Sequence, residues 1–252
     1  MGACTGHVST EEYALHRPEL EDTAEALMHA LRDVSAETLA REVKISPALA
    51  SRLKMMIYDF PHKSSGEQAI TAYTGVVFKA FDYKSLTPIQ KKEACDRIAV
   101  ISSLYGWLNP SDIIKPYRFD FTTTIALGNR SLASYMKDRV TGCLIKRLSR
   151  MKCTEVLNLL PADAAKCIDF KKIEAVAKVW RADFREINLI GEYRTPPSNR
   201  LKTLRGLLLR QIITERINCI SELSQAESEE YMASSCDQEA GKIVFDSVAT
   251  KK

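Results

Sequence analysis

The sequence predicts a mixed α and β protein (an α+β fold), a single compact domain in which a central mixed or antiparallel sheet is flanked by helices. Three observations support this fold class. Some stretches carry apolar residues at helical spacing, whereas shorter ones gather β-branched and aromatic residues. The two kinds of stretch alternate without a regular strand–helix–strand rhythm. With 252 residues, 45% of them hydrophobic, the chain can bury a sizeable core.

Three helices are predicted in the first third of the chain. The first covers Leu20 to Val34, where leucines recur at helical spacing. Ser35 is suited to cap the second helix. The third begins at Ser46-Pro47, with the serine as its cap and the proline in its first turn, and it ends before Pro61.

The rest of the chain is expected to alternate between strands and helices. Strands are predicted over 69–81, where the strand leads into a turn, and over 117–125, 156–160, 176–180, 187–193 and 242–245, and helices over 87–104, 131–151 and 201–217. The strands 176–180 and 187–193 are close in sequence, so a hairpin is expected there. The stretch 104–116 is expected to be a loop, because it is punctuated by Gly106, Pro110 and Pro116.

Composition argues against several classes of protein. No apolar run is long enough to span a bilayer, and residues 1–16 lack the charged and apolar regions of a secretory signal. Seven cysteines at irregular spacing form neither a disulfide framework nor a C-x-x-C pair. We therefore expect a cytoplasmic protein with reduced thiols and no membrane partner.

Signatures of common enzyme chemistry are missing from the sequence. It has no Walker A, no G-x-G-x-x-G and no G-x-S-x-G motif, and its four histidines lie in the first quarter without metal-ligand spacing. No cofactor and no metal are therefore expected, and a binding function is favoured over catalysis.

Charge is unevenly distributed along the chain. The formal net charge is only +4, but residues 137–152 are mostly basic and the charges in 222–239 are all acidic. On a helix over 131–151, Arg139, Lys146 and Arg150 share one face, where they could neutralise neighbouring phosphates or simply be solvated. Tyr117 and Tyr135 are nearby aromatic candidates for stacking on bases.

Residues 38–53 have the pattern of a helix-turn-helix. Ser51 and Arg52 would lie on its second helix, which could enter a major groove. Lys44 occupies the turn position that is usually glycine, and helix pairs joined by short turns also occur in ordinary cores. Both interpretations stay open from the sequence.

Arg205 lies inside the apolar stripe of the predicted helix 201–217, because it is four residues from both Leu201 and Leu209. A guanidinium drawn inward needs a carboxylate, backbone carbonyls or an anionic ligand. Two interpretations therefore stay open, a structural ion pair or an arginine that grips a phosphate at the floor of a cleft.

Four segments, in matching order, resemble the YaaA peroxide-stress family. They are AYTGVVFKAF (72–81), LYGWLNPSDIIKPYRFD (104–120), Asn158-Leu159, and the helix residues Lys202, Arg205, Gly206, Arg210 and Ile212. The resemblance implies a domain over 19–246, followed by a short tail over 247–252. The segment before it, 1–18, is divergent, because the family's Ser-Pro-Ala-Lys-Thr strand has no match there.

The resemblance also implies a positively charged cleft and DNA binding in which a helix-hairpin-helix-like element of the protein takes part. It further implies protection against peroxide and a lowering of free intracellular iron. Carried over by position, the cleft residues are Tyr73, Gly75, Tyr105, Gly106, Tyr117, Arg118, Asn158, Lys202, Arg205 and Arg210, with Asp120 where the family has glutamate.

The leading hypothesis is therefore a stress protein that binds double-stranded DNA through the backbone with weak sequence specificity. Its phosphate contacts are expected at Arg118, Lys202, Arg205 and Arg210, extended by Arg139, Lys146 and Arg150. One alternative is an enzyme acting on a nucleotide or small phosphorylated compound in the same cleft, with Tyr73, Asn158 and Asp120 orienting it and moving protons. Another is a degenerate paralogue that binds nothing well.

Overall fold

A computed structural model describes residues 16–62, 66–127, 129–188 and 190–248, so most of the divergent segment 1–18 and of the tail 247–252 lies outside the described residues. The fold is α+β, as predicted, with a mixed five-stranded sheet flanked by helices. The chain forms two compact units. The first unit contains residues 1–74, 94–147 and 160–170, and the second contains 75–93, 148–159 and 171–252.

The first unit begins with the three predicted helices, which are confirmed as α1 (Glu21–Ala30), α2 (Ala36–Val43) and α3 (Pro47–Asp59), followed by a 3₁₀ turn, η1 (Phe60–His62). The predicted caps are present. The Ser35 hydroxyl accepts a hydrogen bond from the Thr38 N–H (3.2 Å), and the Ser46 hydroxyl accepts one from the Leu49 N–H (3.4 Å).

Short paired strands and helices complete the first unit. Strand β1 (Glu67–Gln68) pairs with β4 (Ile113–Ile114), β2 (Val100–Ser102) with β3 (Gly106–Leu108), and β5 (Ala126–Leu127) with β6 (Arg130–Ser131), each antiparallel. Helices α4 (Ala69–Ala72) and α8 (Ala162–Ala165) also lie in this unit. The predicted helix over 131–151 is confirmed as α7 (Leu132–Met151), whose residues up to Arg147 belong here.

Two predicted strands in this part of the chain were wrong. The predicted strand 69–81 is helical, forming α4 and, in the second unit, α5 (Val76–Phe81) after Gly75 at its N-cap. Residues 117–125 are irregular rather than a strand, because the N–H of Thr124 and the hydroxyls of Thr123 and Thr124 bond to the Glu42 carbonyl, not to a neighbouring strand.

The predicted helix 87–104 ends early, and the predicted loop 104–116 contains two strands. Helix α6 runs only over Pro88–Arg97 and β2 follows it within the predicted helix, whereas β3 and β4 lie within the predicted loop. The Ser102 hydroxyl accepts hydrogen bonds from the N–H groups of Leu104 and Tyr105 (3.2 and 2.9 Å), and Gly106 has φ +70°. This side-chain turn brings the chain back as a hairpin, a local device that hydrophobic periodicity does not reveal.

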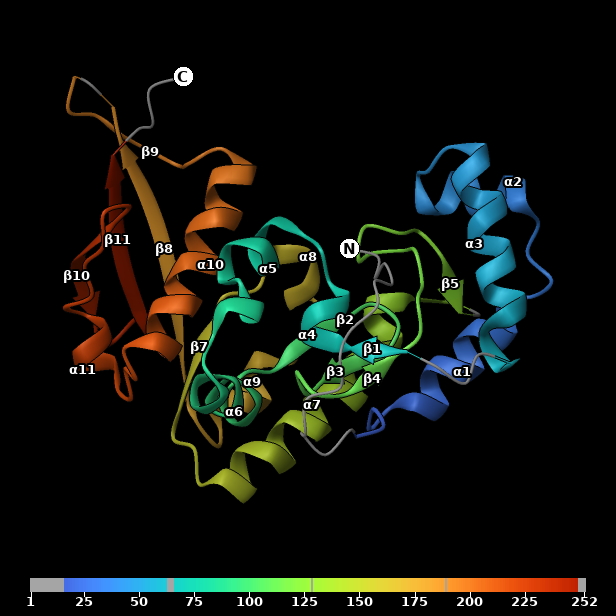
Figure 1. Cartoon of the computed structure of the whole chain (residues 1–252), viewed down its shortest axis with the longest axis horizontal. Coiled ribbons are helices and arrows are strands. Elements are labelled where there is room, and N and C mark those ends of the chain that lie inside the picture. The colour runs from blue at the N-terminus through green and yellow to red at the C-terminus, as the bar shows by residue number, and fades with distance from the viewer. Residues whose placement is uncertain (1–15, 63–65, 128, 189, 249–252) are drawn as a thin grey trace. The chain divides into compact units, whose positions relative to one another are not determined.

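The second unit is built on the five-stranded sheet (Figure 1). Strands β10 (Met232–Asp237), β11 (Lys242–Val248), β8 (Lys178–Ile187) and β7 (Glu155–Asn158) lie in that order, and β9 (Tyr193–Arg194) pairs with the end of β8. β8 is parallel to β7 and β11, whereas β10 and β9 are antiparallel to their neighbours. The mixed sheet is thus confirmed.

Two details of this sheet differ from the prediction. Residues 176–180 and 187–193 do not form two separate strands. A single ten-residue strand, β8, overlaps both ranges, and the hairpin forms only at its end, where Glu186 and Ile187 pair with Arg194 and Tyr193. Strand β10 was not predicted, because MASSCD has neither strong β propensity nor clear alternation. The strand exists because β11 offers it a partner.

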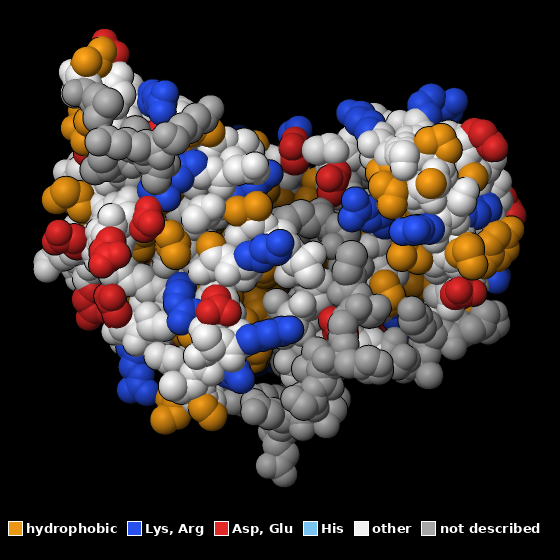
Figure 2. Space-filling model, turned by 45° about the horizontal axis from the view of Figure 1, so that its top comes forward, with side chains coloured by type: hydrophobic (Ala, Val, Ile, Leu, Met, Phe, Trp, Pro, Cys, Tyr) orange, Lys and Arg blue, Asp and Glu red, His pale blue; other side chains and the backbone are white. Residues whose placement is uncertain are grey.

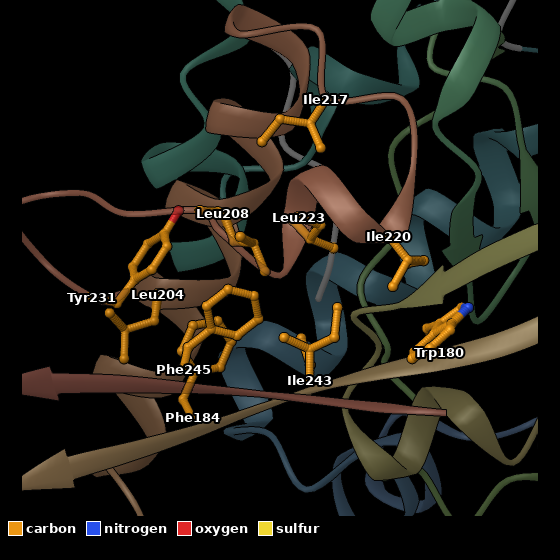
Figure 3. Close-up of a cluster of buried hydrophobic side chains, with 12 residues drawn as sticks. Trp180, Phe184, Leu204, Leu208, Ile217, Ile220, Leu223, Tyr231, Ile243 and Phe245 are labelled. Carbon is orange, nitrogen blue, oxygen red and sulfur yellow. The ribbon is translucent and has the colours of Figure 1, made fainter. Parts of the chain in front are cut away.

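The core of the second unit lies between the sheet and two helices, α10 (Ser198–Thr214) and α11 (Ile220–Leu223) (Figure 3). Phe184 of β8 stacks on Phe245 of β11 with ring centroids 5.3 Å apart, and Tyr231 meets both rings edge-on. Leu204 and Leu208 of α10 are fully buried in the same cluster. α9 (Phe170–Glu174) precedes β8.

Among the helices of the described ranges, none is long and apolar enough to cross a membrane.

Candidate functional site

Lys202 and Arg205 form the most unusual pair of cations in the second unit. They are three residues apart on α10, so their side chains lie on neighbouring parts of one helix face. Both are half-buried, and among the described residues neither has a hydrogen-bond or ion-pair partner. The predicted inward position of Arg205 is therefore confirmed, but the structural ion pair that would explain it is missing from this part of the chain.

The Arg205 guanidinium is poorly satisfied where it lies. Its Nε atom is buried and finds no acceptor among the described residues. Burial lowers the pKa of the guanidinium from its usual value, and the negative charge of Asp183 opposes this shift only in part. A buried donor without an acceptor costs about 1–3 kcal/mol, so this position favours the arrival of an anion.

The Asp183 carboxylate is not available to Arg205 alone, because it forms an ion pair with Lys242 at 2.7 Å. Arg181 lies directly opposite Lys242 in the β8–β11 register, and it is exposed. Asn158, a predicted cleft residue, is half-buried and opposite Arg181 on the other side, at the end of β7. Asp237 lies opposite Lys242 on its other side, so the carboxylates and the cations around Asp183 match in number.

Arg210, another predicted phosphate contact, bonds to the backbone of a neighbouring helix end. Its Nη1 donates to the carbonyls of Phe81 and Asp82 (3.0 Å each), the last carbonyls of α5, and the Asp82 carboxylate is 3.7 Å away. Gly75, a predicted cleft residue, is the N-cap of that same short helix. Both residues thus support the packing of α5 on α10.

Three predicted cleft tyrosines of the first unit are buried and bonded to one another or to backbone. The Tyr117 hydroxyl lies 2.8 Å from that of Tyr73 and 2.9 Å from that of Ser102, and the Tyr105 hydroxyl accepts a hydrogen bond from the Lys115 N–H (3.0 Å). Exposure is 5% for Tyr73 and 1% for the other two tyrosines. Burial raises the pKa of all three hydroxyls, so they stay protonated at neutral pH.

Gly106, another predicted cleft residue, is equally structural. A Cβ at this position would lie 2.7 Å from Leu20 and 2.9 Å from Val140, and its positive φ already favours glycine. Tyr117, proposed from the sequence as a base-stacking residue, is inaccessible for that role. What these family-like positions share in the first unit is burial in a core.

The exposed cations of the first unit are separate from that core. Arg118 and Arg139 are exposed, Lys146 is exposed further along α7, and Arg139 lies over the Tyr135 ring, 4.4 Å from its centroid. Asp120 beside Arg118 is half-buried and accepts two hydrogen bonds from Thr122. Arg150 is exposed in the last turn of α7, which belongs to the second unit.

The α2–α3 pair has the geometry of a tight helix–turn–helix. Lys44 takes the left-handed conformation (φ 57°, ψ 49°) at the position where glycine is usual, and its N–H bonds to the Ala40 carbonyl. Arg41, Lys44 and Arg52 are exposed, whereas Leu53 is fully buried. The pair therefore combines a packed inner side with a basic outer side.

Sequence reasoning missed a buried polar cluster around Arg147. This guanidinium is 7% exposed, donates to the carbonyls of Cys95, Asp96 and Ile98 (3.2, 2.7 and 3.3 Å), and lies 5.0 Å from the Trp107 ring centroid. On the helical wheel Arg147 belonged to a basic segment, and only its burial distinguishes it from its exposed neighbours.

Asp112 belongs to the same cluster. It is 4% exposed and accepts a hydrogen bond from the Asn109 N–H at 2.8 Å. Burial raises the pKa of Asp112 from 3.8 to about 6, although the Asn109 hydrogen bond and the Arg147 charge oppose the shift.

The raised pKa predicts a pH-dependent stability. The folded state holds the proton of Asp112 more tightly than the unfolded chain does. The contribution of Asp112 to the free energy of unfolding therefore falls as pH rises from 3.8 to about 6, by about 3 kcal/mol in total. We expect Asp112→Asn to remove this loss. Urea unfolding at pH 3 to 8 should show the wild type losing stability relative to the variant across this window. Parallel curves would contradict the prediction.

The predicted site residues thus fall into two sets. Arg118, Arg139, Lys146, Asp120 and the three tyrosines belong to the first unit, and Lys202, Arg205, Arg210, Arg150, Asn158 and Gly75 belong to the second. On the face drawn in Figure 2, lysine and arginine side chains are interspersed with acidic ones and form no continuous basic field. Among the predicted phosphate contacts, Lys202 and Arg205 are the ones that lie together and half-buried on one helix.

Known proteins resemble the chain along most of its length. A family model described as peroxide stress protein YaaA matches residues 4–236. A UPF0246 protein of Francisella philomiragia is 28% identical over 227 residues, which cover 88% of each chain. A UPF0246 protein of Bordetella petrii is 28% identical over 233 residues, covering 91% of this chain and 90% of the relative.

Proposed function

Because the chain belongs to the family of peroxide stress protein YaaA, we propose that it is a DNA-binding protein of the peroxide stress response. It would act in the cytoplasm, bind double-stranded DNA mainly through the phosphate backbone, and limit iron-driven damage by shielding the DNA it occupies. The described cysteines are all free, which suits a reducing compartment.

This proposal rests on Lys202 and Arg205, which have no hydrogen-bond or ion-pair partner among the described residues. Two half-buried cations on adjacent turns, with one guanidinium nitrogen lacking an acceptor within the described ranges, form a site that a phosphate oxygen satisfies. Arginine suits this task because its planar guanidinium donates to two oxygens of one phosphate.

Further backbone contacts in the proposal come from exposed cations. Arg118, Arg139, Lys146 and Arg150 are all open to solvent, so phosphates could reach them without rearrangement. The exposed Arg41, Lys44 and Arg52 on the outer side of α2–α3 are a further candidate contact. Each such cation that neutralises a phosphate steepens the salt dependence of binding by about 0.9 in log–log slope.

One observation favours a second candidate, a nucleotide or another small phosphorylated compound. The Arg205 Nε atom is almost inaccessible to solvent, and the terminal phosphate of a small molecule is less hindered in approaching a buried atom than a duplex backbone is. A ligand of this kind that binds the folded state raises the melting temperature. A thermal-shift series with nucleoside mono-, di- and triphosphates therefore separates the two candidates.

Arg205→Gln tests the proposal directly. We expect it to weaken duplex binding about tenfold at low salt and to reduce the log–log salt slope by about 1, because one phosphate contact is lost. The measurement is fluorescence anisotropy of a labelled duplex titrated at several salt concentrations, with circular dichroism to verify folding.

Arg216→Gln is the matched control. It makes the same charge change just beyond the end of α10, on an exposed side chain paired with Glu93 at 3.6 Å. It should leave binding within about twofold of the wild type, since Arg216 is not one of the proposed phosphate contacts and already pairs with Glu93. Equal losses in both variants would mean that net charge alone governs binding, and the assignment of Arg205 would then be wrong.

A further inference from the structure

One face of the β8–β11 part of the sheet is polar and solvent-exposed. Along β8, the side chains of Trp180, Ala182 and Phe184 are buried against α10 and α11, whereas Arg181 and Asp183 between them are exposed. Because side chains alternate along a strand, this second face carries every other residue of β8.

Tyr193 lies on this exposed face. It pairs directly with Ile187 across β8 and β9, and Ile187 lies two residues beyond Arg185, so all three side chains share one side of the sheet. The residue is 54% exposed. This open aromatic ring, on the two-residue strand that pairs with the last residues of β8, is available to a partner.

The Tyr193 ring is already stacked on one side. The Arg185 guanidinium lies 4.2 Å from the ring centroid. Two hydrogen bonds to Asp246 (2.9 and 3.0 Å) and one to Ser234 (3.3 Å) hold this guanidinium in place. A planar group that stacks on the other side of the ring would meet a preorganised surface, so little side-chain entropy would be lost.

One cation on this face forms no ion pair with the described residues, although Asp237 balances the face's charge from the opposite side of Lys242. Asp246 is neutralised by Arg185, and Asp183 by Lys242. Arg181 is exposed, and within the described ranges it has no ion-pair partner. It lies six residues before Ile187 along β8, a distance of about 20 Å. The face therefore offers a stacking ring at one end and a free guanidinium at the other.

We propose that this face, formed by Arg181, Arg185 and Tyr193, binds single-stranded nucleic acid, with a base stacked on Tyr193 and a backbone phosphate at Arg181. The inference rests on the proposed nucleic-acid-binding function and adds a second mode to it. Bases in a duplex are paired and stacked on one another, so only unpaired bases can stack on an exposed ring.

Anisotropy with a labelled single-stranded oligonucleotide and with a duplex of the same sequence tests this mode. Tyr193→Ala should weaken single-strand binding about tenfold, because base–aromatic stacking is lost, and should leave duplex binding unchanged. Tyr193→Phe keeps the ring and should bind both nucleic acids as the wild type does. Arg181→Gln should reduce the single-strand salt slope by about 0.7.

Tyr58→Ala is the matched control, because Tyr58 is a similarly exposed tyrosine (49%) on α3 in the first unit. It should leave single-strand binding unchanged. Single-strand binding that is insensitive to Tyr193→Ala, or equally reduced by Tyr58→Ala, would overturn the proposed mode while the duplex result stands. A wild type that binds neither nucleic acid would instead overturn the proposed function itself.

Discussion

Gly206→Ala is expected to destabilise the protein by about 3 kcal/mol, a large effect for one added methyl group. Gly206 lies where α10 crosses α5. A Cβ at this position would lie 2.3 Å from the Val77 carbonyl oxygen and 2.7 Å from the Ala80 Cβ. Neither atom can turn away, because one is backbone and the other is the first side-chain atom. The two helices would have to separate, which would also stretch the Arg210 contacts to α5.

Gly142→Ala supplies the matched control for this prediction. Gly142 is also a helical glycine, on α7, but a Cβ there would meet nothing within 4 Å. Alanine should therefore stabilise α7 by up to about 1 kcal/mol through its higher helix propensity. Chemical denaturation of both variants measures the contrast. Similar free energies of unfolding for the two would show that α10 and α5 are not in close contact.

Arg147→Met is expected to cost about 3–5 kcal/mol, because methionine fills the volume but donates no hydrogen bond. The carbonyls of Cys95, Asp96 and Ile98 would lose a shared donor in a buried setting. Asp112 would also lose the positive charge that partly offsets its burial, so its pKa should rise above about 6. Urea unfolding as a function of pH therefore reports both consequences.

Arg150→Met makes the same substitution three residues later on α7, where the side chain is exposed. Its free energy of unfolding should stay within about 0.5 kcal/mol of the wild type. A cost below 1 kcal/mol for Arg147→Met would contradict the structural role assigned to this guanidinium. The contrast also tests whether burial, rather than the basic character of the segment, distinguishes the two arginines.

Local signals in the sequence were sufficient for several elements. Ser35 and Ser46 cap their helices as predicted, because capping depends only on a hydroxyl and the next three residues. The inward position of Arg205 also followed from helical spacing alone, but the spacing left open whether a carboxylate or a phosphate meets the guanidinium. Lys202 was expected beside Arg205 only from the resemblance to the YaaA family.

Other features depended on partners distant in the chain. Residues 69–81 contain β-branched and aromatic residues, yet they are helical, because intrinsic propensities are small against the packing of α5 on α10. Strand β10 forms only because β11 lies beside it. For such segments the local conformational preference of a short stretch is worth less free energy than the tertiary contacts that override it.

The roles of the family-like residues divide along the same line. The sequence by itself determined which residues match the segments of the family, the order of those segments, and the inward position of Arg205. Only the tertiary structure decided that Tyr73, Tyr105 and Tyr117 are buried and that Arg210 caps α5. It also placed Tyr193 on Arg185. The physical reason is that exposure and hydrogen-bond partners are properties of the folded surface, to which residues far apart in the chain contribute.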